Sequence, residues 1–241
     1  MPAKRPLARA KRDARDAILA AAMKLISKSG GKKDVSVREI AAEAGVNLAL
    51  VSYYFDGKEG CLAELYRAKM VPSARERTDA LRKLSAGAGV EAVLTEWLAP
   101  MLDLHDHWEF AERHVLMTFM QTYQPSLGGR LFCEIFDVPN SAFADAVLQR
   151  LPFLSRATVI WRLCALAGAA QIYRDEMYQN AMLTLSNRTC QAKDHREQFR
   201  QLIAFGVAGF SAGEPAAPAR LAQKKRKLRP SLVSASGGGS S

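Results

Sequence analysis

The sequence predicts an all-α protein in which a small N-terminal head with a helix-turn-helix precedes a larger helical body. Three observations support this fold class. Apolar residues recur at three- and four-residue spacing through most of the chain, which is the period of an amphipathic helix. Alternating runs of β-branched residues, which would indicate strands, are few. Glycine and proline separate the periodic segments at intervals that suit helices.

The composition is that of a globular protein. The chain has 241 residues, of which 49% are hydrophobic and 24% are charged, so it can bury a core and fits one or two domains. No apolar run approaches the roughly 18 residues of a membrane span, and the basic N-terminus lacks the apolar stretch of a secretory signal. The four cysteines stand far apart, as in proteins of a reducing compartment. We therefore expect a cytoplasmic protein.

Positive charge is concentrated at the two ends of the chain, whose formal net charge is +10. Residues 1–70 hold 14 Lys and Arg against 8 Asp and Glu, and residues 216–241 hold 6 against 0. The middle, residues 71–215, holds 14 against 16. Such an excess indicates a polyanionic partner, either nucleic acid or an anionic membrane. The distribution predicts a basic reading head on a nearly neutral body.

The first elements of the head follow from charge and period. Residues 1–12 are expected to form a disordered basic arm that attracts phosphate without sequence preference. From Asp13 to about Ser29 apolar residues recur at helical spacing, which predicts the first helix. Gly30 and Gly31 end it.

A helix-turn-helix is predicted next. Ser36 and Glu39 have the spacing of a capping box, which begins a second helix. Gly45 tolerates the positive φ that a tight turn between crossing helices requires. Asn47 is a suitable cap for the third helix. In this arrangement the third helix lies in the major groove of DNA and presents its first turns to the bases.

Eight residues of this unit are candidates for contact with DNA. The first turns of the third helix are exposed, and their Leu and Ala side chains can meet the methyl group of thymine, although one of the two leucines can face inward instead. Two tyrosines can each offer a hydroxyl to phosphate. Lys58 is expected at the start of the fourth helix, where free backbone N–H groups favour phosphate. The candidates are Arg38, Asn47, Leu48, Ala49, Leu50, Tyr53, Tyr54 and Lys58.

These residues resemble a known family. The run Ser36-Val-Arg-Glu-Ile-Ala-Ala-Glu-Ala-Gly-Val-Asn, followed by Val51-Ser-Tyr-Tyr-Phe-Asp-Gly-Lys-Glu-Gly, is similar to the DNA-binding domain of TetR-type transcriptional regulators. The resemblance implies an all-α homodimer that binds double-stranded DNA. Each subunit would carry a three-helix head, residues 13–57, on a ligand-binding and dimerisation body, residues 58–211. A palindromic operator requires a two-fold protein, so the DNA-binding role also predicts a homodimer.

The sequence predicts helices throughout the body. A flexible basic tail is predicted at residues 212–241, where Pro, Ala, Gly and Ser predominate. We expect helices near residues 58–84, 90–103, 108–123, 128–136, 141–150, 155–180 and 194–210.

Large apolar and polarizable side chains gather in residues 97–123, as in the lining of a site for a small apolar ligand. An Arg-His pair within this stretch is a candidate for binding a carboxylate or thioester head. Plain core packing explains the same pattern, so both readings stay open. The ligand-binding candidates are Trp97, Met101, Trp108, Arg113, His114, Met117 and Met120.

The resemblance also implies that the last two long helices, near 155–180 and 194–210, form a four-helix bundle with those of a second subunit. Burial within one subunit is the alternative for each residue. The candidates for the dimer interface are Trp161, Cys164, Ala165, Gly168, Ile172, Phe199, Ile203 and Phe210.

Scattered positions of the body are similar to the branch of TetR-type regulators that control fatty-acid β-oxidation. They include Leu65-Tyr-Arg, Met70-Val-Pro, Leu151-Pro-Phe-Leu, Trp161-Arg-Leu and Gly168-Ala. This similarity implies a repressor that a fatty acid or acyl-CoA releases from DNA.

Other function classes lack support in the sequence. No Cys and His spacing suits zinc, and no phosphate loop or nucleophile elbow is present, so we expect no enzyme activity, metal or cofactor. The alternative is a basic helical ligand-binding protein that docks on anionic membranes. It leaves the turn chemistry of residues 36–59 unexplained, so we expect no membrane partner.

Overall fold

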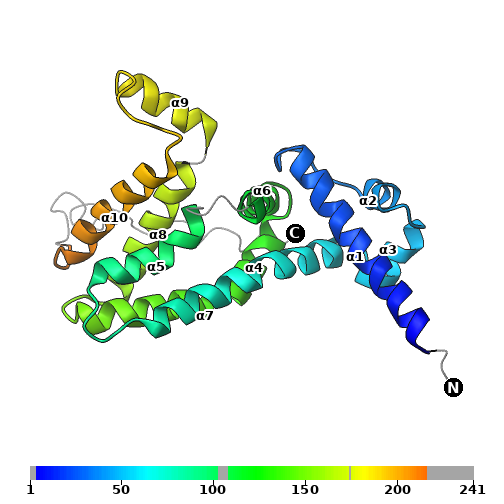
Figure 1. The fold of residues 1–241 in the computed structure, drawn as a ribbon, viewed down its shortest axis with the longest axis horizontal. Helices are drawn as coiled ribbons and strands as arrows, with labels where there is room; N and C mark the ends of the chain where they lie inside the picture. The colour runs from blue at the N-terminus through cyan, green and yellow to red at the C-terminus, as the bar shows by residue number, and fades with distance from the viewer. Residues whose placement is uncertain (1–3, 103–107, 174, 216–241) are drawn as a thin grey trace, which may run out of the picture.

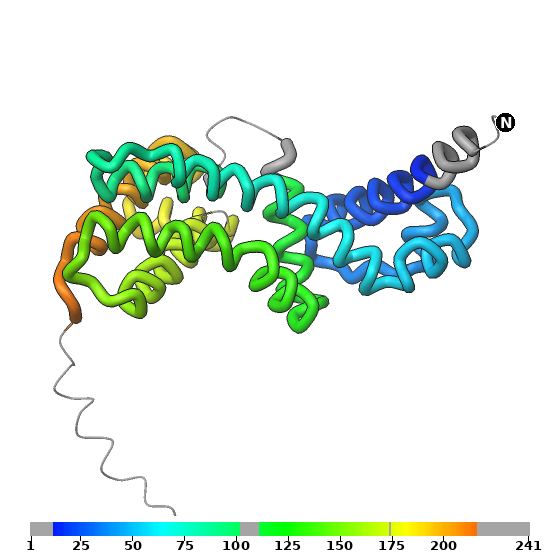
Figure 2. Tube along the Cα trace, turned by 90° about the horizontal axis from the view of Figure 1, so that it is seen from below, coloured from blue at the N-terminus to red at the C-terminus, as the bar shows by residue number. Residues whose placement is uncertain are grey.

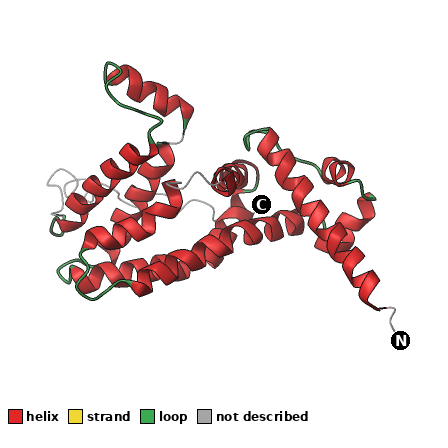
Figure 3. Cartoon of the chain, in the orientation of Figure 1, coloured by secondary structure: helices red, strands yellow, loops and turns green. Residues whose placement is uncertain are grey.

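The computed structural model describes residues 4–102, 108–173 and 175–215, and the side chains within 12–101, 111–173 and 175–215. Across these ranges the chain forms ten α-helices and no strand (Figure 3). The molecule is elongated, with the N-terminal helices at one end and the body at the other (Figures 1 and 2). The predicted all-α class is therefore confirmed. None of the helices in these ranges has the length and apolar composition needed to cross a bilayer.

The helices of the head are short except for the first, and a long fourth helix leads into the body (Figure 1). The first four elements are α1 (Lys4–Lys28), α2 (Val37–Ala44), α3 (Leu48–Phe55) and α4 (Lys58–Lys83). The body adds α5 (Val90–Leu102), α6 (Trp108–Tyr123), α7 (Pro125–Arg150), α8 (Arg156–Ile172), α9 (Glu176–Leu185) and α10 (His195–Ser211).

The first helix begins earlier than the sequence predicts. We expected a disordered arm over residues 1–12, whereas α1 starts at Lys4. Ala, Leu, Arg and Lys dominate this stretch, and all four favour helix. Pro6 lies in the first turn, where its missing N–H costs no helical hydrogen bond.

One long helix replaces the two that were expected at 128–136 and 141–150. Helix α7 runs unbroken from Pro125 to Arg150 with Pro139 buried inside it. An interior proline costs a helix about 3 kcal/mol or more. Burying a Phe side chain contributes about 1.5–3 kcal/mol, and α7 buries Phe136 and Phe143 on either side of the proline. Because α7 packs along α4 (Figures 1 and 2), tertiary contacts on both sides offset the local cost.

The helix expected at 155–180 is instead divided in two. Helix α8 ends at Ile172, and α9 begins after Asp175, whose carboxylate accepts hydrogen bonds from the backbone N–H groups of Met177 and Tyr178. Asp is a strong N-cap residue, so Asp175 in the sequence could have predicted this boundary. Helix α9 buries no residue and projects from the body (Figure 1, yellow).

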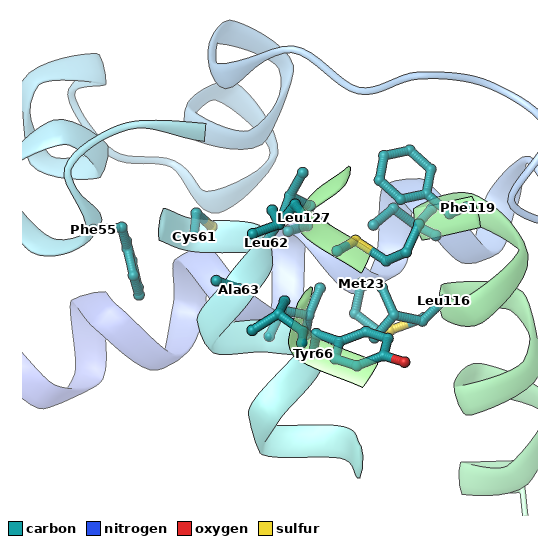
Figure 4. Close-up of a cluster of buried hydrophobic side chains, with 14 of the residues drawn as sticks. Met23, Phe55, Cys61, Leu62, Ala63, Tyr66, Leu116, Phe119 and Leu127 are labelled. Atoms are coloured by element: carbon teal, nitrogen blue, oxygen red, sulfur yellow. The ribbon is translucent and has the colours of Figure 1, made fainter. Parts of the chain in front are cut away.

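Two hydrophobic clusters hold the molecule together. The first joins α1, α2, α3 and the start of α4 to α6 and α7, and Figure 4 shows Met23, Phe55, Cys61, Phe119 and Leu127 among its members. Burial there raises the pKa of the Cys61 thiol to about 11. The second joins the end of α4 to α5, α7, α8 and α10. The head therefore packs directly on body helices.

Candidate nucleic-acid interface and ligand cavity

Local hydrogen bonds shape the helix-turn-helix as expected. The backbone N–H of Glu39 donates to the Ser36 hydroxyl at 3.2 Å, and the Ser36 backbone N–H donates to the Glu39 carboxylate at 2.8 Å. The Ser36 N–H and hydroxyl, helped by Lys33, lower the pKa of Glu39 to about 2. Gly45 has a φ of 66°, and its N–H bonds to the last carbonyls of α2. The predicted capping box and glycine turn are both confirmed.

Helix α3 separates an inner face from an outer one. The amide oxygen of Asn47 accepts the backbone N–H of Ala49 at 2.9 Å, which caps the helix. Val51 and Phe55 are buried beneath it. Leu48 is 42% exposed, and Ala49 is also exposed. The outer face of α3 therefore begins at its first turn, where the major groove would meet it.

Leu50 and Tyr54 lie on the inner side of α3. Both are half-buried and pack on the hydrophobic cluster of the head, so of the two leucines it is Leu50 that faces inward. Tyr53 is 67% exposed, and its ring meets the edge of Tyr54 with centroids 5.1 Å apart. Tyr53 is consequently better placed than Tyr54 to reach a surrounding phosphate.

Lys58 is held by a carboxylate that the sequence analysis did not identify. Its Nζ donates to both oxygens of Asp34, at 2.7 and 2.8 Å, and its side chain is 23% exposed. Asp34 stands in the loop before α2, far along the chain, so no local pattern signals the pair. Arg38, in the first turn of α2, is exposed.

The approach of α3 to α4 depends on a glycine that the sequence analysis passed over. A Cβ atom on Gly60 would lie 1.7 Å from the backbone oxygen of Phe55, so only glycine fits there. Asp56 and Gly57, which connect the helices, both have positive φ. The end of α3 and the start of α4 therefore form one tightly packed corner.

The loop after α1 is fixed to the body by α6. Gly31 has a φ of 75°, and a Cβ atom there would lie 2.6 Å from the backbone oxygen of Val115. The hydroxyl of Tyr123 donates to the backbone oxygen of Lys32. These contacts join the loop that precedes α2 to both halves of α6.

A small cavity brings together four of the seven predicted ligand residues. Its volume is about 50 Å³, and it lies between α4, α5, α6 and α8. We call it the Arg77 cavity. Its lining comprises Ser73, Arg77, Pro100, Met101, Arg113, His114, Met117, Ala170 and Gln171.

The other three predicted ligand residues lie elsewhere. Trp97 is buried in the second cluster, with its ring 5.3 Å from that of Phe143. Met120 lines a separate apolar groove of about 370 Å³ between α4, α6 and α7, together with Phe132. Met117 borders both the cavity and this groove. The side chain of Trp108 lies outside the described residues.

Arg77 is the charged residue of this cavity that the sequence did not lead us to expect. It is 8% exposed, and its guanidinium carbon lies 5.5 Å from the ring centres of both Trp97 and Phe136. Burial, with the nearby charge of Arg113, lowers its pKa to about 10, and Glu76 opposes that shift. It lies at helical spacing with Met70, Ala74 and Leu81 on the buried face of α4, and this position in an apolar stripe was the signal that could have identified it.

The predicted dimer residues divide between surface and core. On α8, Trp161 is 78% exposed and lies on one outer stripe with Cys164, Ala165, Gly168 and Ile172. On α10, Ile203 and Phe210 are buried within the subunit and Phe199 is half-buried against the same cluster. These three do not form the outer surface of α10. Phe205, which is 65% exposed, is its outward aromatic side chain.

Comparisons with known proteins agree with the geometry of the head. Residues 18–65 match the family described as bacterial regulatory proteins, tetR family. The fold is similar to a protein assigned to the TetR family of transcriptional regulators from Rhodococcus sp., with a TM-score of 0.53 and 18% identity over 80% of this chain and 98% of that one. A protein assigned as a transcriptional regulator from Pseudomonas aeruginosa gives 0.53 and 17%, over 81% and 90%. No curated protein matches the sequence.

The family match covers the segment in which the capping box, Gly45 and the outer face of α3 are found. The solved structures extend the similarity of fold to most of the body. Residues 18–65 thus form the N-terminal DNA-binding domain of the TetR family, and the chain has the fold of TetR-family transcriptional regulators.

Proposed function

We propose that this protein is a dimeric repressor that binds a palindromic operator and is released from it by a small apolar ligand, such as a fatty acid or acyl-CoA. The outer face of α3 carries the proposal. It is exposed from its first turn, at the outer end of an elongated molecule (Figure 2), and it belongs to a domain of a DNA-binding family. A helix presented in this way can enter a major groove.

Contacts with DNA would divide by chemistry. Asn47, Leu48 and Ala49 would face base edges, where apolar side chains meet thymine methyl groups. Tyr53 and Lys58 would contact phosphates, which set the position of the helix in the groove. The ammonium of Lys58 has three donors, so it can keep Asp34 and still reach a phosphate oxygen.

The outer stripe of α8 supports a two-fold dimer. Trp161 and Ile172 expose large apolar surface along it, and Ala165 and Gly168 between them are small enough for another helix to approach closely. Phe205 of α10 adds an exposed aromatic ring. Two subunits joined here would present two copies of α3 to two successive half-sites.

Helix α6 would couple the ligand to the head, because it lines the cavity and contacts the head. Met117 lines the cavity, and Val115, Phe119 and Tyr123 of the same helix contact the head or its first loop. A ligand that prefers a shifted α6 would therefore favour a different placement of the heads. Operator DNA would in turn weaken ligand binding by the same factor.

Selection of bound fragments from genomic DNA tests this proposal. We expect the purified full chain at moderate salt to enrich fragments that contain an inverted repeat, and palmitate or palmitoyl-CoA to reduce that enrichment. Liposomes with anionic lipid serve as the competing partner. Equal recovery of all fragments would contradict the proposed operator, and failure to recover any DNA, together with flotation on the liposomes, would overturn the DNA-binding proposal.

A further inference from the structure

We propose that the Arg77 cavity is an anion site that takes the carboxylate group of an organic acid, with the guanidinium of Arg77 as its anchor. The geometry of the cavity alone supports this site. Only the claim that its ligand controls DNA binding rests on the proposed function.

The first reason is that Arg77 is a buried cation that no carboxylate of the described residues pairs with. It is 8% exposed, and its Nε has no hydrogen-bond partner among these residues. Its neighbours are the rings of Trp97 and Phe136, which attract a cation but accept no strong hydrogen bond. Within the described part of the chain, no ion pair joins Arg77 to an acidic residue. A buried guanidinium is costly unless an anion compensates it.

The second reason is the charge and polarity of the lining. Ser73, His114 and Gln171 supply groups that can donate hydrogen bonds, and Arg113 adds a second guanidinium. The described lining contains no Asp or Glu. Donors from three helices thus surround a space whose described lining is free of acidic side chains, and a carboxylate would give the Nε of Arg77 an acceptor.

A second buried donor lies beside the first. The indole Nε1 of Trp97 is also buried without a hydrogen-bond partner, and its ring is the one that covers Arg77. Two neighbouring unsatisfied donors are unusual in a protein interior, where almost all buried polar groups are paired. Trp97 does not itself line the cavity, so its indole shows that hydrogen-bond acceptors are scarce among the described residues around the guanidinium of Arg77.

The size and the apolar walls favour a carboxylate over a phosphate or a coenzyme head. The cavity of about 50 Å³ has room for several water molecules, which need about 10–15 Å³ each on the same measure. Pro100, Met101 and Ala170 form its apolar walls. A planar carboxylate matches the guanidinium fork and fits this space. A flexible side chain, Met117, separates the cavity from the apolar groove, into which a hydrocarbon tail can extend.

Matched pairs of acids and amides test the site with the full chain. Hexanoate, decanoate and benzoate are titrated against the wild-type protein by calorimetry, beside hexanamide, decanamide and benzamide. We expect at least one acid to bind saturably and its amide to bind about tenfold more weakly or not at all, because the amide lacks the charge that the guanidinium pairs with. Inorganic phosphate is the control anion and is expected not to bind.

Arg77→Met separates a ligand anchor from a structural arginine. Methionine keeps the length and apolar contacts of the side chain without its charge, so we expect the melting temperature of the unliganded variant to equal or exceed that of wild type. We expect its affinity for the acid to fall by about tenfold or more. Arg75→Met makes the same change at an exposed position of α4 and is expected to bind the acid like wild type.

Three results would overturn the inference. The first is that none of the acids binds. The second is that the amides or phosphate bind as tightly as the acids. The third is that Arg77→Met binds the acid with the affinity of wild type. A variant with a lower melting temperature and unchanged ligand affinity would assign Arg77 a structural role instead. Gel shifts with operator DNA distinguish the two proposals. Acids that bind without releasing DNA would contradict ligand-controlled repression but not the anion site. Neutral amides that release DNA would contradict the anion site but not ligand-controlled repression.

Discussion

At the level of single residues, the pairing of Lys58 with Asp34 determines how the start of α4 can meet a phosphate. The two groups form a short ion pair at the surface of the head. Surface pairs contribute little to stability, about 0–1 kcal/mol. The pair is therefore better understood as a restraint on the direction of the Lys58 side chain than as a support of the fold.

We expect Lys58→Ala to weaken binding to all DNA sequences alike. Each phosphate contact contributes about 0.9 to the slope of log K against log salt, so losing one contact per subunit should lower the slope by about two for a dimer. Asp34→Ala should strengthen binding, since it frees the ammonium for phosphate. Fluorescence anisotropy over a salt series measures both. Lys83→Ala, at the far end of α4, is the control, and an unchanged slope in Lys58→Ala would contradict the phosphate role.

Glu39 makes the head sensitive to acid. Its pKa is lowered from 4.5 to about 2 in the folded chain, chiefly by the Ser36 backbone N–H. The contribution of the charged carboxylate is complete above about pH 4.5 and is lost as the pH falls toward 2. We expect Glu39→Gln to have a lower melting temperature than wild type at pH 6 and a shrinking difference as the pH falls. A difference that stays constant from pH 6 to 3 would refute this prediction.

At the level of elements, the helices follow from the sequence where the signal is local. The capping box at Ser36 and the turn at Gly45 each depend on residues within a few positions, and both were predicted. The unbroken course of α7 through Pro139 depends on its packing along α4, which no local pattern contains. The same reason hides the ion pair of Lys58 and the aromatic contacts of Arg77, because their partners come from distant elements.

The junction of the first loop with α6 predicts unequal effects for two neighbouring glycines. Gly30 and Gly31 both have positive φ, and a side chain in that region costs about 1–2 kcal/mol. A Cβ atom on Gly30 meets nothing within 4 Å, whereas one on Gly31 meets the backbone of Val115. We expect Gly31→Ala to lower the free energy of unfolding by clearly more than Gly30→Ala in urea titrations. Equal decreases in the free energy of unfolding for the two variants would show that the backbone at Val115 moves away from the new Cβ atom without an energetic cost.

At the scale of the whole molecule, the outer stripe of α8 determines the predicted assembly. Trp161 is 78% exposed, so replacing it removes little packing within the subunit. Truncating a central Trp of an interface costs about 2 kcal/mol or more, which is about thirtyfold in the dissociation constant. We expect Trp161→Glu to sediment as a monomer at concentrations where wild type is a dimer, and to lose operator affinity. Val138→Glu, at an apolar site on α7 that is 56% exposed, should leave both unchanged.

The shared hydrophobic cluster at the junction of head and body limits how this protein can be re-engineered. Phe119 and Leu127 belong to the body in sequence, yet they cover apolar side chains of α1 and α4 (Figure 4). If the head were cut at residue 57 and transplanted onto a foreign sensor, the apolar side chains of α1 would lose this cover and contact water. A chimera that also carries the inner faces of α6 and α7 keeps them covered. A hybrid biosensor must therefore keep α4, α6 and α7 with the reading head, and because α7 also packs in the second cluster, no boundary within the described body leaves both clusters intact.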